Sequence, residues 1–352
     1  MSLKDGWSAI HLEMPARVPR TEYSAHNHWS LVRAVTGQLV SPASPEPDRE
    51  RAAEAFVRAW NYDYMWSILI SRDEMGSLRT DMGHAEYEEG GADRRAANAC
   101  PFASPEEALC FDPRAAYGAP DRAALRRRFE EHYRDQCPKY PEAANSTGIY
   151  ITLVSGLIEI FGWDMMLMAL GTDPEGFGAL MDRYALWIQD YFETLAETDV
   201  PVVMIHDDIV WTSGPFCHPD WYRRYVFPHY HRFFRPLLDA GKRLLFTSDG
   251  TYTLFADDIA AAGVHGFVME PTTDLEWMAP KYGQTHVLIG NADTRILLSG
   301  TKEQIRSEVE RCMRAGKSCT GFFMAVGNHI PANTPVDNAI YYNEVYEELS
   351  RR

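Results

Sequence analysis

The second half of the chain repeats one chemical pattern, a short apolar run that ends in residues able to bind a metal or move a proton. Residues 200–205 form such a run and end in a His-Asp-Asp sequence, and residues 243–248 form another that ends in aspartate. Three further runs end in glutamate, in asparagine and in an Asn-His pair. The side chains concerned are His206, Asp207, Asp208, Asp249, Glu270, Asn291, Asn328 and His329.

Carboxylates that meet at one site repel one another and raise each other's pKa. A divalent metal such as zinc, bound by histidine nitrogen and carboxylate oxygen, would relieve this repulsion. A carboxylate that stays protonated as a general acid, or side chains that bind only backbone amides, would relieve it as well. We expect Asp207, Asp249 and His329 to be catalytic. The expected metal ligands are His206, Asp249, Glu270 and His329.

Other polar residues are expected to bind the substrate. They are Asp208, Asn291 and Asn328 and, from the first half of the chain, His26, His28 and His84. Structural roles compete with these interpretations, because Asp-Gly is a common turn pair and one of two adjacent aspartates can cap a following segment. Cys217 has no matching His-Cys pattern, and the absence of GxSxG gives a nucleophilic triad little support.

Helical segments alternate with the apolar runs, which predicts five strand-then-helix units and a parallel sheet with right-handed crossovers. An open doubly wound sheet also fits the alternation, but the sequence has no GxGxxG or GxxxxGK[ST] phosphate turn. We therefore predict a single (β/α)8 barrel over residues 1–352, with an irregular N-terminal extension and long mouth loops. The polar run ends would then meet at the C-terminal mouth of the barrel.

The expected elements of the second half are strands at 200–205, 243–250, 266–271, 285–291 and 321–326, with helices at 218–240, up to 262, 274–282, 301–315 and 335–349. In the first half we expect a strand at 18–24, helices at 48–60, 123–135 and 173–197, and a mouth loop near 79–89.

Composition limits the classes of partner. A net charge of -16 over 352 residues disfavours binding to nucleic acid and to anionic membranes. Six cysteines without a CxxC pair indicate reduced thiols and a cytoplasmic location. The longest apolar stretch, 149–170, is interrupted by polar residues and glycines, so no membrane span is expected. We expect a small-molecule substrate, and both a monomer and a homodimer stay open.

Several stretches resemble the superfamily of uroporphyrinogen decarboxylases and corrinoid-dependent methyltransferases, including methylcobalamin:coenzyme M methyltransferases. They are the His-Asp-Asp sequence, HPDWYRRYVFPHY, the Gly-Val-His-Gly turn at 263–266, LIGNADTRILLSGTKEQIRSEV and VGNHIPANTPVDN. The resemblance covers residues of about 148–350 and, loosely, 17–19. It implies a (β/α)8 barrel, and either decarboxylation or methyl transfer.

Departures from the pattern decide between these activities. The decarboxylases carry an Arg-rich RQAGRYLPEY segment that binds substrate carboxylates, whereas residues 21–28 here contain no arginine. Their Phe-Ser-Asp-Ile-Leu segment has only an echo at 66–69, without the aspartate. Where the zinc methyltransferases have His-x-Cys and a distant Cys, this chain has Thr247-Ser248-Asp249 and Asn328.

The resemblance therefore favours an enzyme of the methyltransferase type, which moves a methyl group between a small methylated substrate, a corrinoid on a separate protein and an acceptor. A decarboxylase or other lyase acting on a porphyrinogen or small carboxylate is the alternative. A non-catalytic barrel that binds a small ligand is the third interpretation.

Overall fold

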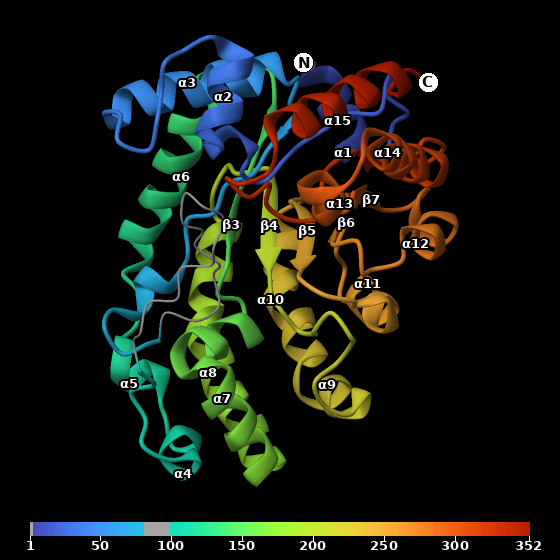
Figure 1. Ribbon diagram of the computed structural model, residues 1–352. Helices are drawn as coiled ribbons and strands as arrows, with labels where there is room; N and C mark the ends of the chain where they lie inside the picture. Colours follow the sequence, from blue (N-terminus) through green and yellow to red (C-terminus); the bar gives the residue numbers. More distant parts are fainter. Residues whose placement is uncertain (1–2, 81–98) are drawn as a thin grey trace.

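Parallel strands form the centre of the structure and helices surround them (Figure 1). This computed structural model describes residues 3–80 and 99–352. Six strands pair in the order β3-β4-β5-β6-β7-β8, and β1 pairs with β2. The strands are β1 (Tyr64–Met65), β2 (Ala144–Asn145), β3 (Thr147–Ile149), β4 (Val202–His206), β5 (Arg243–Ser248), β6 (Gly266–Met269), β7 (Val287–Ile289) and β8 (Phe322–Phe323).

Backbone hydrogen bonds continue the sheet around into a ring. The amide of Met324, just after β8, donates to Pro19 at 2.8 Å, and Arg20 forms a parallel bridge with Met324. The amide of Asp63 then donates to Arg20 at 2.9 Å, and β1 begins at the next residue. The ring is therefore the predicted (β/α)8 barrel, and the expected first strand, 18–24, is reduced to a few bridging residues.

Side chains along a strand point alternately to its two faces, so successive strand residues pack into two different apolar cores. In β4, Val202 and Met204 belong to a small cluster with Leu245 and Val268, whereas Val203 and Ile205 belong to the large cluster that includes the helices. Side chains at even positions of β4 thus face the barrel interior, and those at odd positions face the helix layer. This alternation decides where the polar residues beyond each strand point.

The helices follow the predicted order with two differences. The expected helix at 218–240 is divided at Val226, because Pro228 lies in the first turn of a second helix and cannot continue the first. Short helices also fill stretches for which none was expected. The helices are α1 (Leu3–Ile10), α2 (Trp29–Thr36), α3 (Glu46–Ala59), α4 (Pro105–Leu109), α5 (Pro113–Tyr117), α6 (Arg122–Lys139), α7 (Val154–Thr172), α8 (Pro174–Ala196), α9 (Pro219–Tyr225), α10 (Phe227–Asp239), α11 (Ala256–Ala261), α12 (Leu275–Tyr282), α13 (Thr294–Ser299), α14 (Lys302–Gly316) and α15 (Val336–Leu349).

One helix among the described residues, α7, is long and apolar enough to cross a membrane by length and composition alone. Inside the fold, however, 72% of its apolar window is buried. Gly162 interrupts its helical backbone with a φ of 70°, which an L side chain would rarely adopt. These features identify α7 as a helix of the protein core.

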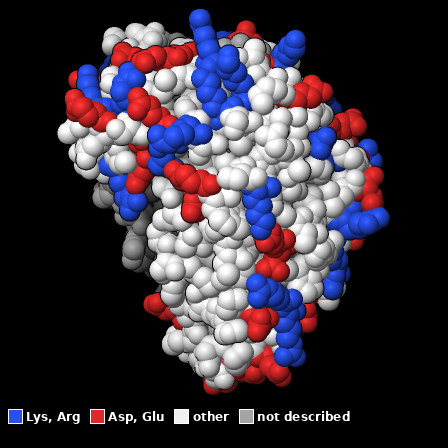
Figure 2. Space-filling model, turned by 90° about the vertical axis from the view of Figure 1, so that its right-hand side faces the viewer, with Lys and Arg blue, Asp and Glu red and all other residues white. Residues whose placement is uncertain are grey.

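Acidic and basic side chains are interspersed on the face shown in Figure 2, with apolar and neutral side chains between them. No continuous stripe of Lys and Arg crosses that face. A basic stripe of that kind is the usual surface for binding the phosphates of a nucleic acid.

Candidate functional site

A cavity of about 260 Å³ opens at the C-terminal ends of the barrel strands. Its polar wall comes from the ends of β4, β5, β6 and β8, as the sequence predicts. The opposite wall comes mainly from the first half of the chain and is richer in aromatic and apolar groups. The lining residues are Tyr23, His26, Trp66, Ser67, Ile68, Tyr150, Met204, His206, Thr247, Ser248, Asp249, Val268, Glu270, Gly327, Asn328 and His329.

His206 is the last residue of β4 and is almost fully buried. Its ring stacks on Tyr150 at a centroid distance of 3.9 Å. Nδ1 lies 3.2 Å from the backbone carbonyl of Tyr150 and 3.4 Å from the hydroxyl of Ser155. Nε2 lies 3.2 Å from Oδ1 of Asp208. These contacts fix the ring with Nδ1 toward the protein and Nε2 toward the carboxylates.

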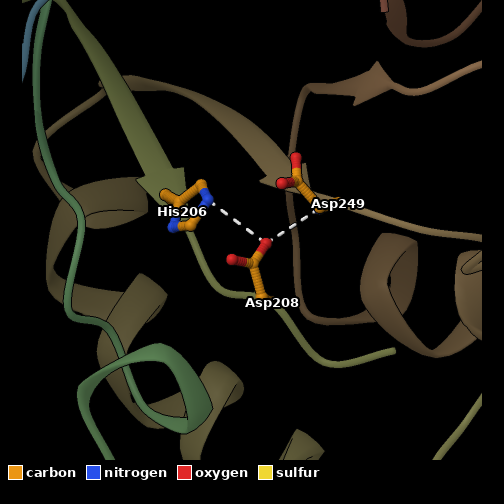
Figure 3. A group of neighbouring side chains, drawn as sticks. All are labelled: His206, Asp208 and Asp249. Atoms are coloured by element: carbon orange, nitrogen blue, oxygen red, sulfur yellow. Dashed lines mark hydrogen bonds and ion pairs between the residues drawn. The ribbon is translucent and has the colours of Figure 1, made fainter. Parts of the chain in front are cut away.

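Asp208 and Asp249 complete a compact group with His206, shown in Figure 3. The backbone amide of Asp249 donates to Oδ1 of Asp208 at 2.8 Å, and the amide of Asp208 donates to the hydroxyl of Ser155 at 2.7 Å. One ligand atom from each of the three residues lies within 4.8 Å of the other two. The carboxylate of Asp249 is exposed to the cavity.

Charge crowding shifts the ionisation of this group. Burial tends to lower the pKa of His206, but the negative charges of Asp208 and Asp249 and the carbonyl of Tyr150 raise it to about 9. Although the carboxyl group of Asp249 reaches the cavity, the surrounding barrel mouth separates it from bulk water, and this desolvation, followed by the charges of Asp208 and Glu270, raises its pKa well above the ordinary value. His206 and Asn328 only partly oppose that rise in Asp249.

Glu270 and Asn328 form a second polar arm beside Asp249. The amide of Gly250 donates to Oε2 of Glu270 at 2.6 Å, and Nδ2 of Asn328 donates to Oε1 at 2.5 Å. Nδ2 of Asn328 also lies 3.4 Å from Oδ1 of Asp249. The backbone amide of His329 donates to Oδ1 of Asn328 at 2.7 Å. Both oxygens of Glu270 are therefore engaged by the protein.

Four expected site residues lie outside the described cavity lining, namely Asp207, Asp208, His28 and Asn291. Asp208, which was expected to bind the substrate, is buried beside the cavity in the compact group with His206 and Asp249. Asp207 faces the helix layer, where it accepts hydrogen bonds from the amides of Leu153 and Ser155 and, at 2.5 Å, from the hydroxyl of Tyr230. Burial raises the pKa of Asp207 to about 6, against the effect of these hydrogen bonds. The expected catalytic role is corrected, since Asp207 holds the start of α7 instead.

His28 and Asn291 are corrected in the same way. His28 accepts from the amide of Leu31 through Nδ1 and contacts the carbonyl of Thr334 through Nε2, so it caps α2. Asn291 donates to the carbonyls of Glu270 and Thr273 and accepts from Arg311 through Oδ1. Neither residue lines the cavity, and both side chains have their polar atoms engaged.

Of the remaining expected residues, His26 and His329 line the cavity, and His84 lies outside the described residues. Burial lowers the pKa of His26 to about 4, and its Nδ1 has no hydrogen-bond partner among the described residues. His26 is therefore neutral at neutral pH. The ring of His329 lies 5.9 Å from that of Tyr23.

The expected metal set is brought together only in part. His206 and Asp249 are adjacent, but Glu270 and His329 lie outside the compact group, and Asp208 takes their place. One imidazole nitrogen and two carboxylates suit a divalent ion that accepts nitrogen and oxygen ligands. The positions that carry thiolates in zinc methyltransferases hold Asp249 and Asn328 here, so a thiolate-rich zinc site does not fit.

Other residues in or beside the cavity wall carry little signal in the sequence. Tyr23 and Trp66 stack at 4.6 Å in the opposite wall, and Ser67 contacts Nε2 of His132, which comes from α6. Aromatic residues are common in cores, and no spacing rule joins positions 67 and 132. The short Trp-Ser-Ile-Leu echo at 66–69 was the one available indication of this wall.

Glu159 in α7 was also missed. Its side chain is fully buried, and neither carboxyl oxygen has a hydrogen-bond partner among the described residues. Burial raises the pKa of Glu159 to about 8, although Arg72 and Arg79 act in the opposite direction. Its position inside an apolar helical stretch gives no indication of this state in the sequence.

Basic side chains are the next feature of the cavity lining. Among the described residues that line the cavity there is no lysine or arginine. Arg20, which belongs to the first ring segment, is fully buried and bonds to Glu22 at 2.7 Å. The described lining therefore supplies no guanidinium or ammonium group to receive a substrate carboxylate, and its one raised imidazole, His206, is already paired with Asp208.

Comparison with known proteins places these features in a family. The profile of the uroporphyrinogen decarboxylase (URO-D) family matches residues 149–349. A uroporphyrinogen decarboxylase of Thermus thermophilus is 30% identical over 171 residues, 49% of this chain and 48% of the relative. One of Carboxydothermus hydrogenoformans is 29% identical over 210 residues, 58% of this chain and 57% of the relative. The chain thus aligns with about half the length of the curated relatives it matches.

A solved methyltransferase from Methanosarcina mazei has the same fold, with a TM-score of 0.64 at 15% identity over 99% of both chains. The family profile covers more than half of this chain, including the ends of β4 to β8 that carry the polar wall of the cavity. The chain therefore belongs to the uroporphyrinogen decarboxylase (URO-D) family.

Proposed function

We propose that the protein moves a methyl group between a small methylated substrate, held in the cavity, and an acceptor such as a corrinoid on a separate protein. The observation that carries this proposal is the division of the cavity into two walls with no lysine or arginine in its described lining. One wall is polar, with Asp249, Glu270 and Asn328. The other is aromatic and apolar, with Tyr23 and Trp66 stacked together.

Each wall suits one part of a methylated compound. The apolar wall excludes water and packs against the methyl group, whose transfer requires a dry path. The polar wall supplies hydrogen-bond partners for the heteroatom that carries the methyl group. A cavity of about 260 Å³ lies just below the usual range for drug-sized ligands, which favours a substrate of a few non-hydrogen atoms.

A reduced corrinoid supplies a nucleophile for methyl groups, and a methylated corrinoid supplies a methyl donor. In this scheme the residues of the chain bind and orient the substrate. Asn328, held between Asp249 and Glu270, is positioned to fix the heteroatom. Tyr150 and His206, whose rings are stacked on each other, line the cavity beside it.

Decarboxylation is the second candidate, because relatives that match the chain are named uroporphyrinogen decarboxylase. The acidic groups beside the cavity favour it, since a carbanion left by loss of CO2 requires a proton. The absence of lysine and arginine from the described lining opposes it, because a porphyrinogen with many carboxylates needs cations to bind it.

The experiment compares the two reactions in one preparation. Purified protein is incubated with methylcobalamin and a panel of small thiol and amine acceptors, and the visible spectrum of the corrinoid is followed. The same protein is given uroporphyrinogen, and CO2 release is measured. We expect loss of methylcobalamin that depends on the acceptor, and no CO2.

Asp249→Ala should abolish the spectral change, whereas Asp164→Ala, which alters an exposed carboxylate on α7, should leave it intact. Release of CO2 without any change in methylcobalamin would replace this proposal with the decarboxylase. A protein that binds small ligands but shows neither reaction would favour a binding role.

A further inference from the structure

The group formed by His206, Asp208 and Asp249 has the geometry of a metal site. Their ligand atoms lie within 4.8 Å of one another, so small side-chain movements would bring all three into contact with a single ion (Figure 3). His206 and Asp208 come from the end of β4 and the loop after it, and Asp249 follows the neighbouring strand β5. Figure 3 shows the three side chains converging on one space between these strand ends.

The orientation of His206 is an independent observation that points to the same use. Its Nδ1 is 3.2 Å from the carbonyl of Tyr150, and its ring is stacked on the Tyr150 ring with planes 8° apart. A histidine that binds a metal usually donates its other ring N–H to a carbonyl or carboxylate, which fixes the tautomer and aims the free nitrogen. Nε2 is thereby left facing Asp208.

The carboxylate of Asp208 is held in place by the protein before any ligand arrives. Oδ1 of Asp208 accepts from the backbone amide of Asp249, and the amide of Asp208 donates to Ser155. Parallel pairing of β4 with β5 sets His206 beside Thr247 and so fixes the spacing of the group. Ligands carried on strand ends are positioned more firmly than ligands on long loops.

Charge favours a cation at this position. Asp208, Asp249 and Glu270 lie together, and the described lining supplies no lysine or arginine to neutralise them. Glu270 already has both oxygens bonded to Gly250 and Asn328, so it acts as a nearby charge and not as a third carboxylate ligand. A doubly charged ion would offset the repulsion among these groups.

We propose that His206, Asp208 and Asp249 bind one divalent metal ion of the zinc or manganese type. Three protein ligands leave further coordination positions open, and the exposed carboxylate of Asp249 sets the ion at the cavity wall. The donor set contains no thiolate, which distinguishes it from Cys-rich zinc sites. This inference is independent of the proposed methyl transfer, since a decarboxylase or a binding protein could hold the same ion.

The test measures metal directly. Full-length protein is stripped with a chelator and dialysed, and binding of Zn²⁺ and Mn²⁺ is measured by titration calorimetry, with the metal content checked by mass spectrometry. We expect one ion per chain. Asp249→Ala and His206→Ala should weaken binding by about 100-fold or more, because each removes a ligand, and Ser155→Ala should weaken it by about 10-fold through His206 and Asp208.

His329→Ala is the matched control, because His329 lines the cavity outside the proposed ligand set and carries no negative charge beside it. This variant should retain one ion per chain with little change in affinity, whereas Glu270→Gln should keep the ion but bind it more weakly, since it removes a nearby negative charge. Circular dichroism and thermal unfolding of each stripped variant separate loss of the ligand from loss of the fold. Asp249→Ala is the most informative change, because among the described residues its carboxylate has one hydrogen-bond partner, Asn328, and its loss disturbs little else.

Co²⁺ provides a spectroscopic readout of the ligand type. The visible spectrum of the Co²⁺ form should lack a thiolate charge-transfer band and should disappear in Asp249→Ala. Stripped wild-type protein that takes up no ion, or that binds equally well without Asp249 and His206, would overturn the proposal. A thiolate band that disappears in Cys217→Ser would move the site elsewhere.

Discussion

Glu159 places an ionisable carboxyl group inside the core without a hydrogen-bond partner among the described residues. Removing a carboxylate from water is costly, so the neutral acid is favoured and burial raises the pKa to about 8. Between the ordinary carboxyl pKa and this value, the folded protein holds a proton that the unfolded chain has lost. The stability that Glu159 supports is therefore present in acid and is lost as the pH rises.

The free energy of unfolding should fall between pH 5 and pH 8 by on the order of 4 kcal/mol through this group alone, at about 1.36 kcal/mol for each unit. Glu159→Gln keeps the shape and removes the titration, so its stability should vary less over this range. Urea denaturation at pH 5, 6.5 and 8 in the presence of a chelator measures both proteins. Parallel pH dependences for the wild type and the variant would show that Glu159 does not titrate in this range.

The His-Asp-Asp sequence after β4 shows how far local periodicity can predict which residues face the cavity. Alternation along β4 sends His206 into the barrel with Met204 and sends Asp207 toward the helices, where Tyr230 meets it. Extending the period of two past the strand end was enough to exclude Asp207 from the cavity. The roles of His28 and Asn291 depend on Thr334 and Arg311, which are distant in the chain, so no local pattern could have assigned them.

At the scale of elements, the strand-then-helix units of the second half were predicted well because each buried strand is a continuous apolar run. The strands β4 to β8 all fall within or next to the expected ranges. The first half was predicted less well, since its ring segments are only a few residues long and owe their conformation to backbone bonds with distant strands. Such pairing leaves little periodicity in the sequence.

Gly250 connects β5 to the polar wall and cannot be replaced without strain. Its φ is +80°, and a Cβ would lie 2.5 Å from the backbone oxygen of Trp211. Gly37, which ends α2, has a similar φ of +71° but nothing within 4 Å of a Cβ. An alanine at Gly37 would therefore add backbone strain alone, whereas an alanine at Gly250 would add backbone strain and a steric collision.

We expect Gly37→Ala to cost about 1 kcal/mol, from the left-handed backbone alone. Gly250→Ala should cost more, because it adds the collision and disturbs the amide that binds Glu270. Chemical denaturation measures both losses. Equal losses in the two variants would show that the loop after β5 yields to accommodate the methyl group.

At the scale of the whole molecule, the family match begins near residue 149, yet the cavity needs residues from both sides of that point. The matched half supplies the polar wall, and the first half supplies Tyr23, Trp66 and Ser67. Membership of the family thus follows from the half that carries the carboxylates. The aromatic wall of the cavity comes from the other half, which lies before the start of the family match.

A buried ion pair joins the two halves. Arg20 and Glu22 are both fully buried, and Glu22 also accepts from the amide of Val326 and from the hydroxyl of Tyr342 in α15. Arg20 lies over the rings of Trp60 and Tyr346. The pair therefore fastens the first ring segment to the last strand and the last helix.

Arg20→Met should destabilise the protein by about 3–5 kcal/mol, because it leaves the Glu22 carboxylate buried without its cation. The double variant Arg20→Met with Glu22→Gln should recover part of this loss, since no buried charge is then unpaired. Urea denaturation of the two single variants and the double variant completes the cycle. Strictly additive losses would show that the two side chains do not act as a pair.

The closure of the ring between Pro19 and Met324 also has a consequence for biosynthesis. A nascent chain on the ribosome can pair its middle strands as they emerge. The hydrogen bonds between Pro19 and Met324, which close the ring, cannot form until residues near 324 have been translated. Throughout that interval both margins of the unfinished sheet present unpaired amides and carbonyls, the kind of surface that recruits chaperones and promotes aggregation. Slow translation late in the message would lengthen this exposure more than slow translation early in it.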